Sequence, residues 1–458
     1  MNKTIQKWRI VFMNKKKRNV LCKLALIMAM VMVFLTACGT NNSDTNTTAE
    51  GEVTEISFTW WGDTERHERY NAIVALFEAE NPDVKVVTEP ANWSDYWTRL
   101  STQSAGGNAP TLFGMHPQYV SDYALRGALA NLEEFVENGT IAVDKIETAV
   151  VDSGRVNGEL LMVSQGVTFQ GFLANRTLLE KHGATIPASD EDWTWEEFVQ
   201  AARDYTESAN ATGVSAPFVA DQTGTWLVFR YYARQLGGDV FTEDGQLGFE
   251  EERLVAYFEM WNELREMGAV PDQATVTEDE QRALEQKILA NNGLGMQVWP
   301  ANQLPLYQSV GGGSEYDMLR IPVTQGQVQR AEYIEGAYFA VSENATDAQK
   351  EAAARLIHFF VNTEEASDIF KMEQGVPANT VLAERVMTDL SEDDIKVVSY
   401  VSALMSIADT GVYPPLGAQE INTLFMNVGE RVSHGLLTPQ EAAAQFMNEA
   451  NAILEREQ

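Results

Sequence analysis

The chain has 458 residues and carries 66 Asp or Glu against 33 Lys or Arg, so its formal net charge at pH 7 is −33. This acidity argues against binding to nucleic acids and to anionic membrane surfaces, because both are polyanions. The length predicts two or three domains, and a hydrophobic content of 45% is enough to give each a packed core.

Residues 1–37 have the pattern of a signal peptide. They hold eight Lys or Arg and no acidic residue, and residues 24–35 are twelve consecutive apolar residues. Twelve residues form a helix of roughly 18 Å, too short for the ~30 Å hydrocarbon core, so cleavage is favoured over a retained transmembrane helix. Without residues 1–37 the chain keeps 25 basic and 66 acidic residues, and its net charge becomes −41. The sequence leaves open whether translation starts at Met1 or at Met13.

Cys38 follows Leu35-Thr36-Ala37, and these four residues resemble the bacterial lipobox. In a lipobox the thiol receives a diacylglyceryl group and cleavage makes the cysteine N-terminal; two acyl chains, such as palmitate, anchor a protein stably. An ordinary secretory signal with an incidental Cys is the alternative. Residues 38–52 are polar and predict a flexible tether. Because the other cysteine, Cys22, leaves with the signal, no thiol remains for a disulfide, a metal or a nucleophile.

The following segments alternate in type. Period-two alternation predicts a strand over residues 53–60, helical spacing predicts a helix over 65–80, and β-branched residues predict a second strand over 84–88. A helix around 96–104 and a strand over 111–113 come next. This βαβαβ order predicts an open, mostly parallel sheet with helices on its faces.

Three later helices are announced by capping boxes, in which a hydroxyl N-cap precedes a Glu or Gln by three residues. Strand pieces are expected over 294–299 and 319–322, so a second α/β lobe is predicted. The boxes pair Thr194 with Glu197, Thr346 with Gln349, and Thr438 with Glu441, the last with Pro439 at the first helical position.

Stretches through most of the chain resemble the extracellular solute-binding proteins of carbohydrate ABC importers, family 1, the maltose-binding-protein-like group. Their order and spacing behind a lipobox make the resemblance specific. They are residues 56–62, 77–86, 103–113, 123–129, 194–198, 336–342 and 374–377.

The resemblance implies a two-lobed α/β fold of the periplasmic-binding-protein type II, with a ligand cleft between lobes joined by hinge strands. It implies an N-terminal lobe of residues 53–163 plus 319–373 and a C-terminal lobe of 164–318 plus 374–458. It also implies a monomer without cofactor that binds a carbohydrate and delivers it to the transmembrane permease subunits of an ABC importer. The protein would be lipid-anchored on the extracytoplasmic face of the bacterial cell membrane.

A sugar site needs flat aromatic surfaces and polar side chains that both donate and accept hydrogen bonds. Trp60, Trp61, Asp63 and Glu65 stand at the carboxyl end of the first strand, where open α/β sheets place ligands. Because strand residues alternate faces, one of the two tryptophans is expected in the core and the other towards the cleft. Asp63 resembles a sugar-binding position of the family; its alternative role is the N-cap of the following helix.

Further candidates stand at the ends of other strands or before turns. His116 and Gln118 follow the strand at 111–113, with a capped turn as the alternative role. Trp195 and Trp261 are expected in the core instead. The remaining candidates are Trp93, Gln165, Trp226, Trp299, Tyr333 and Glu335.

An anchored glycoside hydrolase or lyase is the rival from another class, since it needs only a positioned carboxylate pair or a base. The sequence has no G-x-S-x-G elbow, H-E-x-x-H motif, P-loop or EF-hand pattern. Its five histidines are scattered, so no metal site is predicted, and His358 is expected to be structural. A binding protein that reports to a sensor kinase is a third possibility. The identity, size and charge of the sugar are not readable from the sequence.

The lipobox gives a direct prediction. Cys38→Ala removes the acyl acceptor, so the variant should leave the membrane fraction and appear in the soluble fraction, as fractionation and immunoblotting would reveal. A variant that stays firmly membrane-bound would contradict lipid anchoring at Cys38.

Overall fold

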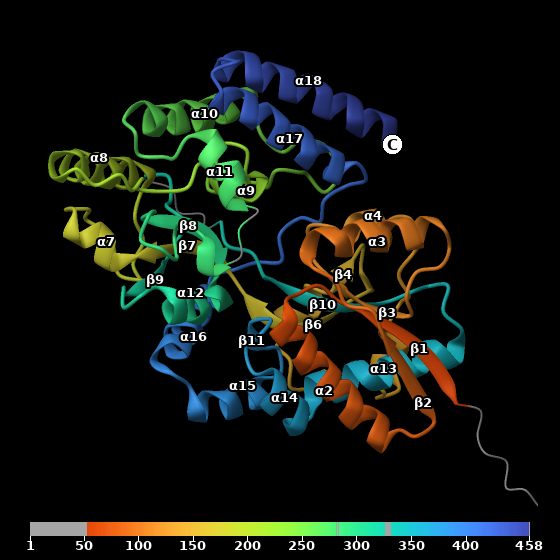
Figure 1. Ribbon diagram of the computed structural model, residues 1–458. Coiled ribbons are helices and arrows are strands. Elements are labelled where there is room, and N and C mark those ends of the chain that lie inside the picture. The colour runs from red at the N-terminus through yellow and green to blue at the C-terminus, as the bar shows by residue number, and fades with distance from the viewer. Residues whose placement is uncertain (1–52, 281, 283, 326–330, 458) are drawn as a thin grey trace, which may run out of the picture. The chain divides into compact units, whose positions relative to one another are not determined.

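The computed structural model describes residues 53–280, 282, 284–325 and 331–457 (Figure 1). The predicted signal peptide, the lipidation site Cys38 and the tether at 38–52 lie outside these residues.

A six-stranded sheet forms the first half of the fold, with strand order β11-β6-β10-β3-β1-β2. β1 pairs parallel with both β2 and β3, whereas β10 runs antiparallel to β3 and to β6. The predicted βαβαβ order is confirmed, but the prediction of a mostly parallel sheet is wrong. Three of the five strand pairings are antiparallel, because β10 and β11 return from later in the chain against the direction of β3 and β6. The strands are β1 (Thr54–Thr59), β2 (Val84–Thr88), β3 (Leu112–Met115), β6 (Val163–Thr168), β10 (Glu335–Val341) and β11 (Val376–Pro377).

Helices cover both faces of this sheet because its strands are apolar on both. Leu112 and Phe113 of β3 point to opposite sides and join two separate hydrophobic clusters. One face carries α2 (Thr64–Glu80), α13 (Asp347–Asn362) and α14 (Glu364–Phe370), and the other carries α3 (Trp93–Ala105) (Figure 1).

A second, three-stranded antiparallel sheet has β7 (Gln170–Asn175) between β8 (Met296–Pro300) and β9 (Tyr316–Leu319). Helices bury a further aromatic core beside it, and Figure 1 shows α10, α17 and α18 lying together. These helices are α8 (Trp195–Thr212), α9 (Trp226–Arg234), α10 (Glu251–Glu266), α17 (Ala418–Ser433) and α18 (Pro439–Glu457). Trp195 and Trp261 lie in this core, as predicted.

The remaining elements are mostly short. They are α4 (Val120–Ala124), α5 (Glu133–Glu137), α6 (Thr148–Asp152), β4 (Arg155–Val156), β5 (Glu159–Leu160), α7 (Arg176–Lys181), α11 (Gln273–Glu280), η2 (Leu284–Gln286), η3 (Ala301–Gln303), α12 (Leu304–Val310), α15 (Thr380–Val386), η4 (Met387–Asp389) and α16 (Glu392–Met405).

All three predicted capping boxes are present. The Thr194 hydroxyl accepts from the Glu197 N–H at 3.1 Å, and the Glu197 carboxylate accepts from the Thr194 N–H at 2.7 Å. The same reciprocal bonds start α13 and α18. Each box satisfies N–H groups that the first helical turn would otherwise leave unpaired.

The chain crosses from the larger sheet to the smaller one over a single residue. β6 ends at Thr168 and β7 begins at Gln170, so Phe169 alone separates a strand of the larger sheet from one of the smaller. Since β6 pairs wholly within the larger sheet, we propose that the first lobe boundary lies at Phe169, a few residues after the boundary predicted at 163.

Gly375 allows the chain to turn tightly into β11. Its φ is +103°, and a Cβ there would lie 2.4 Å from the Val167 carbonyl oxygen of β6. Because β6 is held by pairing on both sides, this carbonyl cannot retreat without breaking the ladder.

Gly375→Ala should therefore destabilise the fold by more than the ~1–2 kcal/mol of a left-handed alanine alone. Gly107→Ala is the matched control, because Gly107 also has a positive φ, +73°, but nothing within 4 Å of the added methyl. Thermal unfolding followed by circular dichroism compares the two variants. Equal losses in both would show that the contact with Val167 does not matter.

Candidate functional site

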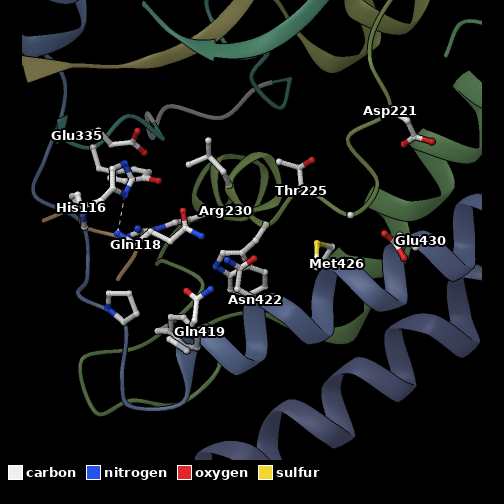
Figure 2. Close-up of a pocket in the computed structure, with 18 of the residues that line it drawn as sticks. His116, Gln118, Asp221, Thr225, Arg230, Glu335, Gln419, Asn422, Met426 and Glu430 are labelled. Atoms are coloured by element: carbon white, nitrogen blue, oxygen red, sulfur yellow. Dashed lines mark hydrogen bonds between the residues drawn. The ribbon is translucent and has the colours of Figure 1, made fainter. Parts of the chain in front are cut away.

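A cavity of about 440 Å³ lies where the larger sheet meets helices α9 and α17 (Figure 2). Its walls come from parts of the chain that are far apart in sequence. The lining residues used below are His116 and Gln118 after β3, Trp226 and Arg230 on α9, Tyr333 and Glu335 at the start of β10, Gln419, Asn422 and Glu430 on α17, and Asp221.

Strand register explains why two of these segments meet. β10 is antiparallel to β3, with Tyr338 opposite Met115, so the start of β10 runs beside the residues that follow β3. Glu335 is at the same time opposite Thr168, at the end of β6. The site thus occupies the carboxyl ends of β3 and β6, the edge at which open α/β sheets bind ligands.

His116 presents a hydrogen-bond donor to the cavity. Its Nδ1 accepts from the Gln118 N–H at 3.2 Å, and burial lowers the pKa of His116 to about 4. The ring is therefore neutral at pH 7, and its proton is assigned to Nε2 because Nδ1 acts as an acceptor.

Arg230 is held in place by a buried carboxylate. Asp239, 1% exposed, accepts from Arg230 Nε at 2.8 Å and from an Arg230 Nη at 2.7 Å, and it also accepts from Arg234. Burial by itself would raise the pKa of Asp239, but the two guanidinium groups and the Val412 N–H outweigh burial and lower it. The cluster is a fixed, internally paired unit.

Tyr333 and Glu335 complete this end of the cavity. The Arg230 guanidinium carbon lies 4.0 Å from the centre of the Tyr333 ring, a cation–π contact. Glu335 is 3% exposed and accepts from Gln170 Nε2 at 3.0 Å. Burial raises the pKa of Glu335, while hydrogen bonds from Tyr333 and Gln170 and the charge of Arg230 act against that shift.

Trp226 provides a flat apolar surface in the opposite wall. It is half-buried in the first turn of α9, and its ring packs against Phe229, Phe241 and Phe425, the last at 5.1 Å between ring centres. One part of the indole is fixed in the aromatic core and another part lines the cavity.

Helix α17 adds polar groups that the sequence reasoning missed. Gln419 Oε1 is buried and has no hydrogen-bond partner among the described residues, and Asn422 follows one turn later. A buried acceptor without a donor is unfavourable, so a ligand donor that reaches Gln419 Oε1 would be stabilising. Polar residues on a surface helix give no sequence signal for this role.

Five of the predicted site residues line the cavity and seven do not. Those that line it are His116, Gln118, Trp226, Tyr333 and Glu335. Those outside its lining are Trp60, Trp61, Asp63, Glu65, Trp93, Gln165 and Trp299.

The two adjacent tryptophans face opposite sides of the sheet, as strand alternation predicted. Trp60 is 1% exposed, and its Nε1 donates to His67 at 3.2 Å in the core. Trp61 is 7% exposed and packs edge-on to Trp93, with its ring centre 6.3 Å from that of His116. Trp93 is 41% exposed and also touches His116, so Trp61 and Trp93 lie next to the cavity lining.

The other residues outside the lining have local roles. Asp63 takes its alternative role, since its carboxylate caps α2 by accepting from the Arg66 N–H at 3.0 Å. Glu65 is exposed and pairs with Arg69.

Gln165 and Trp299 lie deeper in the structure. Gln165 is buried between Tyr70 and the Tyr338 carbonyl, to which its amide donates at 3.0 Å. Trp299 is half-buried, with its ring centre 6.1 Å from that of Tyr307.

Neither a membrane-spanning helix nor a metal cluster is found among the described residues. In the part of the chain that the structure describes, no helix combines the length and apolarity needed to cross a membrane. Over the same residues, no three His, Cys, Asp or Glu gather as a metal site would require. His358 is structural, as predicted, because its Nδ1 accepts from the Ala142 N–H at 3.1 Å.

Residues 72–397 match the family described as bacterial extracellular solute-binding protein. Since the match spans more than half of the chain, the chain belongs to this family, and the predicted resemblance is confirmed. A protein described as an uncharacterized lipoprotein in the oleD 5' region of Streptomyces antibioticus is 27% identical over 190 residues. That alignment covers 40% of this chain and 39% of the relative, so the chain spans about two fifths of that relative's length.

Solved structures share the fold over nearly the whole described chain. An extracellular solute-binding protein of family 1 from Alicyclobacillus acidocaldarius is 26% identical, with a TM-score of 0.66 over 88% of this chain and 99% of that one. A periplasmic oligogalacturonide binding protein from Yersinia enterocolitica, in complex with saturated digalacturonic acid, is 19% identical, with a TM-score of 0.75 over 88% and 99%. The chain has the predicted two-lobed α/β fold of these proteins.

Asp239 should be essential for stability. Asp239→Ala leaves Arg230 and Arg234 buried without their shared partner, and we expect a loss of about 3–5 kcal/mol in the free energy of unfolding. Asp368→Ala is the matched control, because Asp368 also binds one arginine, Arg385, through both oxygens, at 2.8 Å each, but at an exposed site. Chemical denaturation measures both losses, and a similar small loss in each would contradict the role of Asp239.

The pH dependence follows from the lowered pKa of Asp239. The contribution of its ionised form to stability is complete above its ordinary value of 3.8 and is lost as pH falls through the lower folded value. The stability difference between wild type and Asp239→Asn should therefore shrink below about pH 4.

Proposed function

We propose that this protein is a lipid-anchored extracytoplasmic receptor that binds a sugar or oligosaccharide and delivers it to the permease of an ABC importer. The observation that carries the proposal is the cavity itself. It joins a fixed aromatic surface, Trp226, to polar groups from both sides, including His116 and Gln419.

These groups match the surface of a sugar ring. The Trp226 face suits the C–H groups of the ring, His116 Nε2–H suits a hydroxyl oxygen, and Gln419 Oε1 suits a hydroxyl hydrogen. A micromolar dissociation constant requires about 8 kcal/mol, which one stacked ring with several hydrogen bonds supplies. The carbohydrate complex of the Yersinia relative supports the ligand class.

Closure of the lobes would couple binding to delivery. A ligand that touches both His116 and α17 stabilises the closed arrangement, because hinge closure follows differential affinity for the two states. The permease would then recognise the closed, loaded form.

The anchoring proposal rests on the lipobox at Cys38 and the polar tether at 38–52. The partial match to a Streptomyces lipoprotein supports it.

We also propose that the protein is not an enzyme. Hydrolysis of a glycosidic bond commonly uses two carboxylates on either side of it. In this cavity Asp221 pairs with Arg265 at 2.9 Å, and Glu335 is hydrogen-bonded to Gln170 and Tyr333, which leaves Glu430, exposed at the opposite end, as the third lining acid. Turnover of a saccharide by the purified protein would overthrow this reading.

A thermal-shift screen over mono-, oligo- and acidic saccharides tests the receptor proposal. A ligand that binds only the folded state raises the melting temperature, so at least one saccharide should do so. Gln419→Leu and Trp226→Leu should each weaken that saccharide about tenfold or more. Gln440→Leu is the matched control for Gln419, because Gln440 is exposed on α18. No shift with any saccharide, or equal affinity in all four proteins, would count against the site.

A further inference from the structure

We propose that the cavity selects neutral or amine-bearing saccharides and rejects uronic acids, with Glu335 as the residue that sets this preference. The inference rests on the proposed function, that the cavity binds a carbohydrate. It concerns the charge of the ligand, which neither the fold nor the family decides.

More acidic than basic side chains line the cavity. Arg230 is the lining cation among the described residues, whereas Asp221, Glu335 and Glu430 are lining acids. His116 adds no charge at pH 7 because burial keeps its ring neutral. Figure 2 shows Glu335 beside His116 at one end of the cavity, and Asp221 and Glu430 towards the other.

The charge of Arg230 is already balanced by a carboxylate of the protein. Two of its nitrogens bind Asp239, and one of these also donates to the Val412 carbonyl at 3.0 Å. Arg234 shares Asp239 and binds Asp409 at 2.6 Å. Two guanidinium groups thus meet two carboxylates, and the cluster is neutral as a unit.

Asp221 is neutralised in the same way. Arg265 binds it at 2.9 Å, and the Thr223 N–H donates to it at 2.8 Å. The acids left without an ion pair among the described residues that line the cavity are Glu335, in the wall, and Glu430, exposed at the opposite end.

The hydrogen-bond partners of Glu335 are neutral, and Arg230, the cation that acts on it, is itself bound to Asp239. Gln170 donates an amide N–H to Glu335 at 3.0 Å, and Tyr333 donates its hydroxyl. Neither partner neutralises the Glu335 carboxylate. Because Glu335 is buried, a charged ligand group beside it interacts with this carboxylate more strongly than it would in water.

Three classes of ligand group would interact differently with Glu335. A uronate beside Glu335 either repels it or forces it to take up a proton, and both outcomes weaken binding. A hydroxymethyl group donates a hydrogen bond to it without a change of charge. An ammonium group gains an attraction that a hydroxyl does not.

Matched saccharides test the rule on the purified wild-type protein. Calorimetric titration would compare α-1,4-galactobiose with α-1,4-digalacturonate, which differ at C6, and cellobiose with its diglucosamine analogue, which differs at C2. Maltose and β-1,4-mannobiose, each compared with a disaccharide that carries the corresponding uronate, extend the panel. We expect the tightest binder to be neutral or amine-bearing, and to exceed its uronate counterpart by at least about tenfold.

Glu335→Gln removes the charge and keeps the shape. It should reduce the preference for the neutral over the acidic member by about tenfold, because the repulsion is gone. Glu159→Gln is the control, since Glu159 is exposed on β5 and outside the cavity lining, and it should leave the ratio unchanged. The wild-type ratio alone tests the charge rule if Glu335→Gln does not fold.

The outcomes separate the two proposals. If no saccharide binds, the receptor proposal fails and the charge rule falls with it. If saccharides bind and the uronates bind as tightly as their neutral partners or more tightly, the receptor proposal stands and the charge rule is wrong. If the preference persists unchanged in a folded Glu335→Gln protein, Glu335 does not set it.

Discussion

The antiparallel pairing of β10 with both β3 and β6 is the constraint on which the site depends. It joins a strand from late in the chain to two strands from its first half, and it sets their register. As a result Glu335 lies beside the residues that follow β3. Phe169, the residue after β6, lies at the same edge of the sheet. Backbone hydrogen bonds therefore fix one wall of the cavity before any ligand arrives.

Two further features hold the other wall. The aromatic core around Phe229 and Phe425 fixes one part of the Trp226 ring, and Asp239 fixes Arg230. Such fixed groups lower the entropy that binding must overcome. The ion pair with Asp239 that orders Arg230 also balances its charge, so Arg230 has a structural role. The charge that a ligand meets at this end of the cavity then depends on Glu335.

Local patterns predicted the elements well and the site in part. Alternation predicted that Trp60 and Trp61 lie on opposite sides of the sheet without deciding which side each takes, and the strand-end rule found His116 and Gln118. Trp299 stood out as an aromatic at a strand end beside proline, yet it packs near Tyr307 outside the cavity lining. Position at a strand end does not tell which way a side chain turns once helices pack over it.

The sequence by itself determined the helices and strands, the capping boxes, the α/β class and the family resemblance, because these depend on residues close together in the chain. The tertiary structure alone decided that Gln419 and His116 line one cavity, that Asp239 binds Arg230, and which other candidates share that cavity. The reason is physical: these contacts join residues far apart in sequence, and only strand register and helix packing bring them within reach of one another.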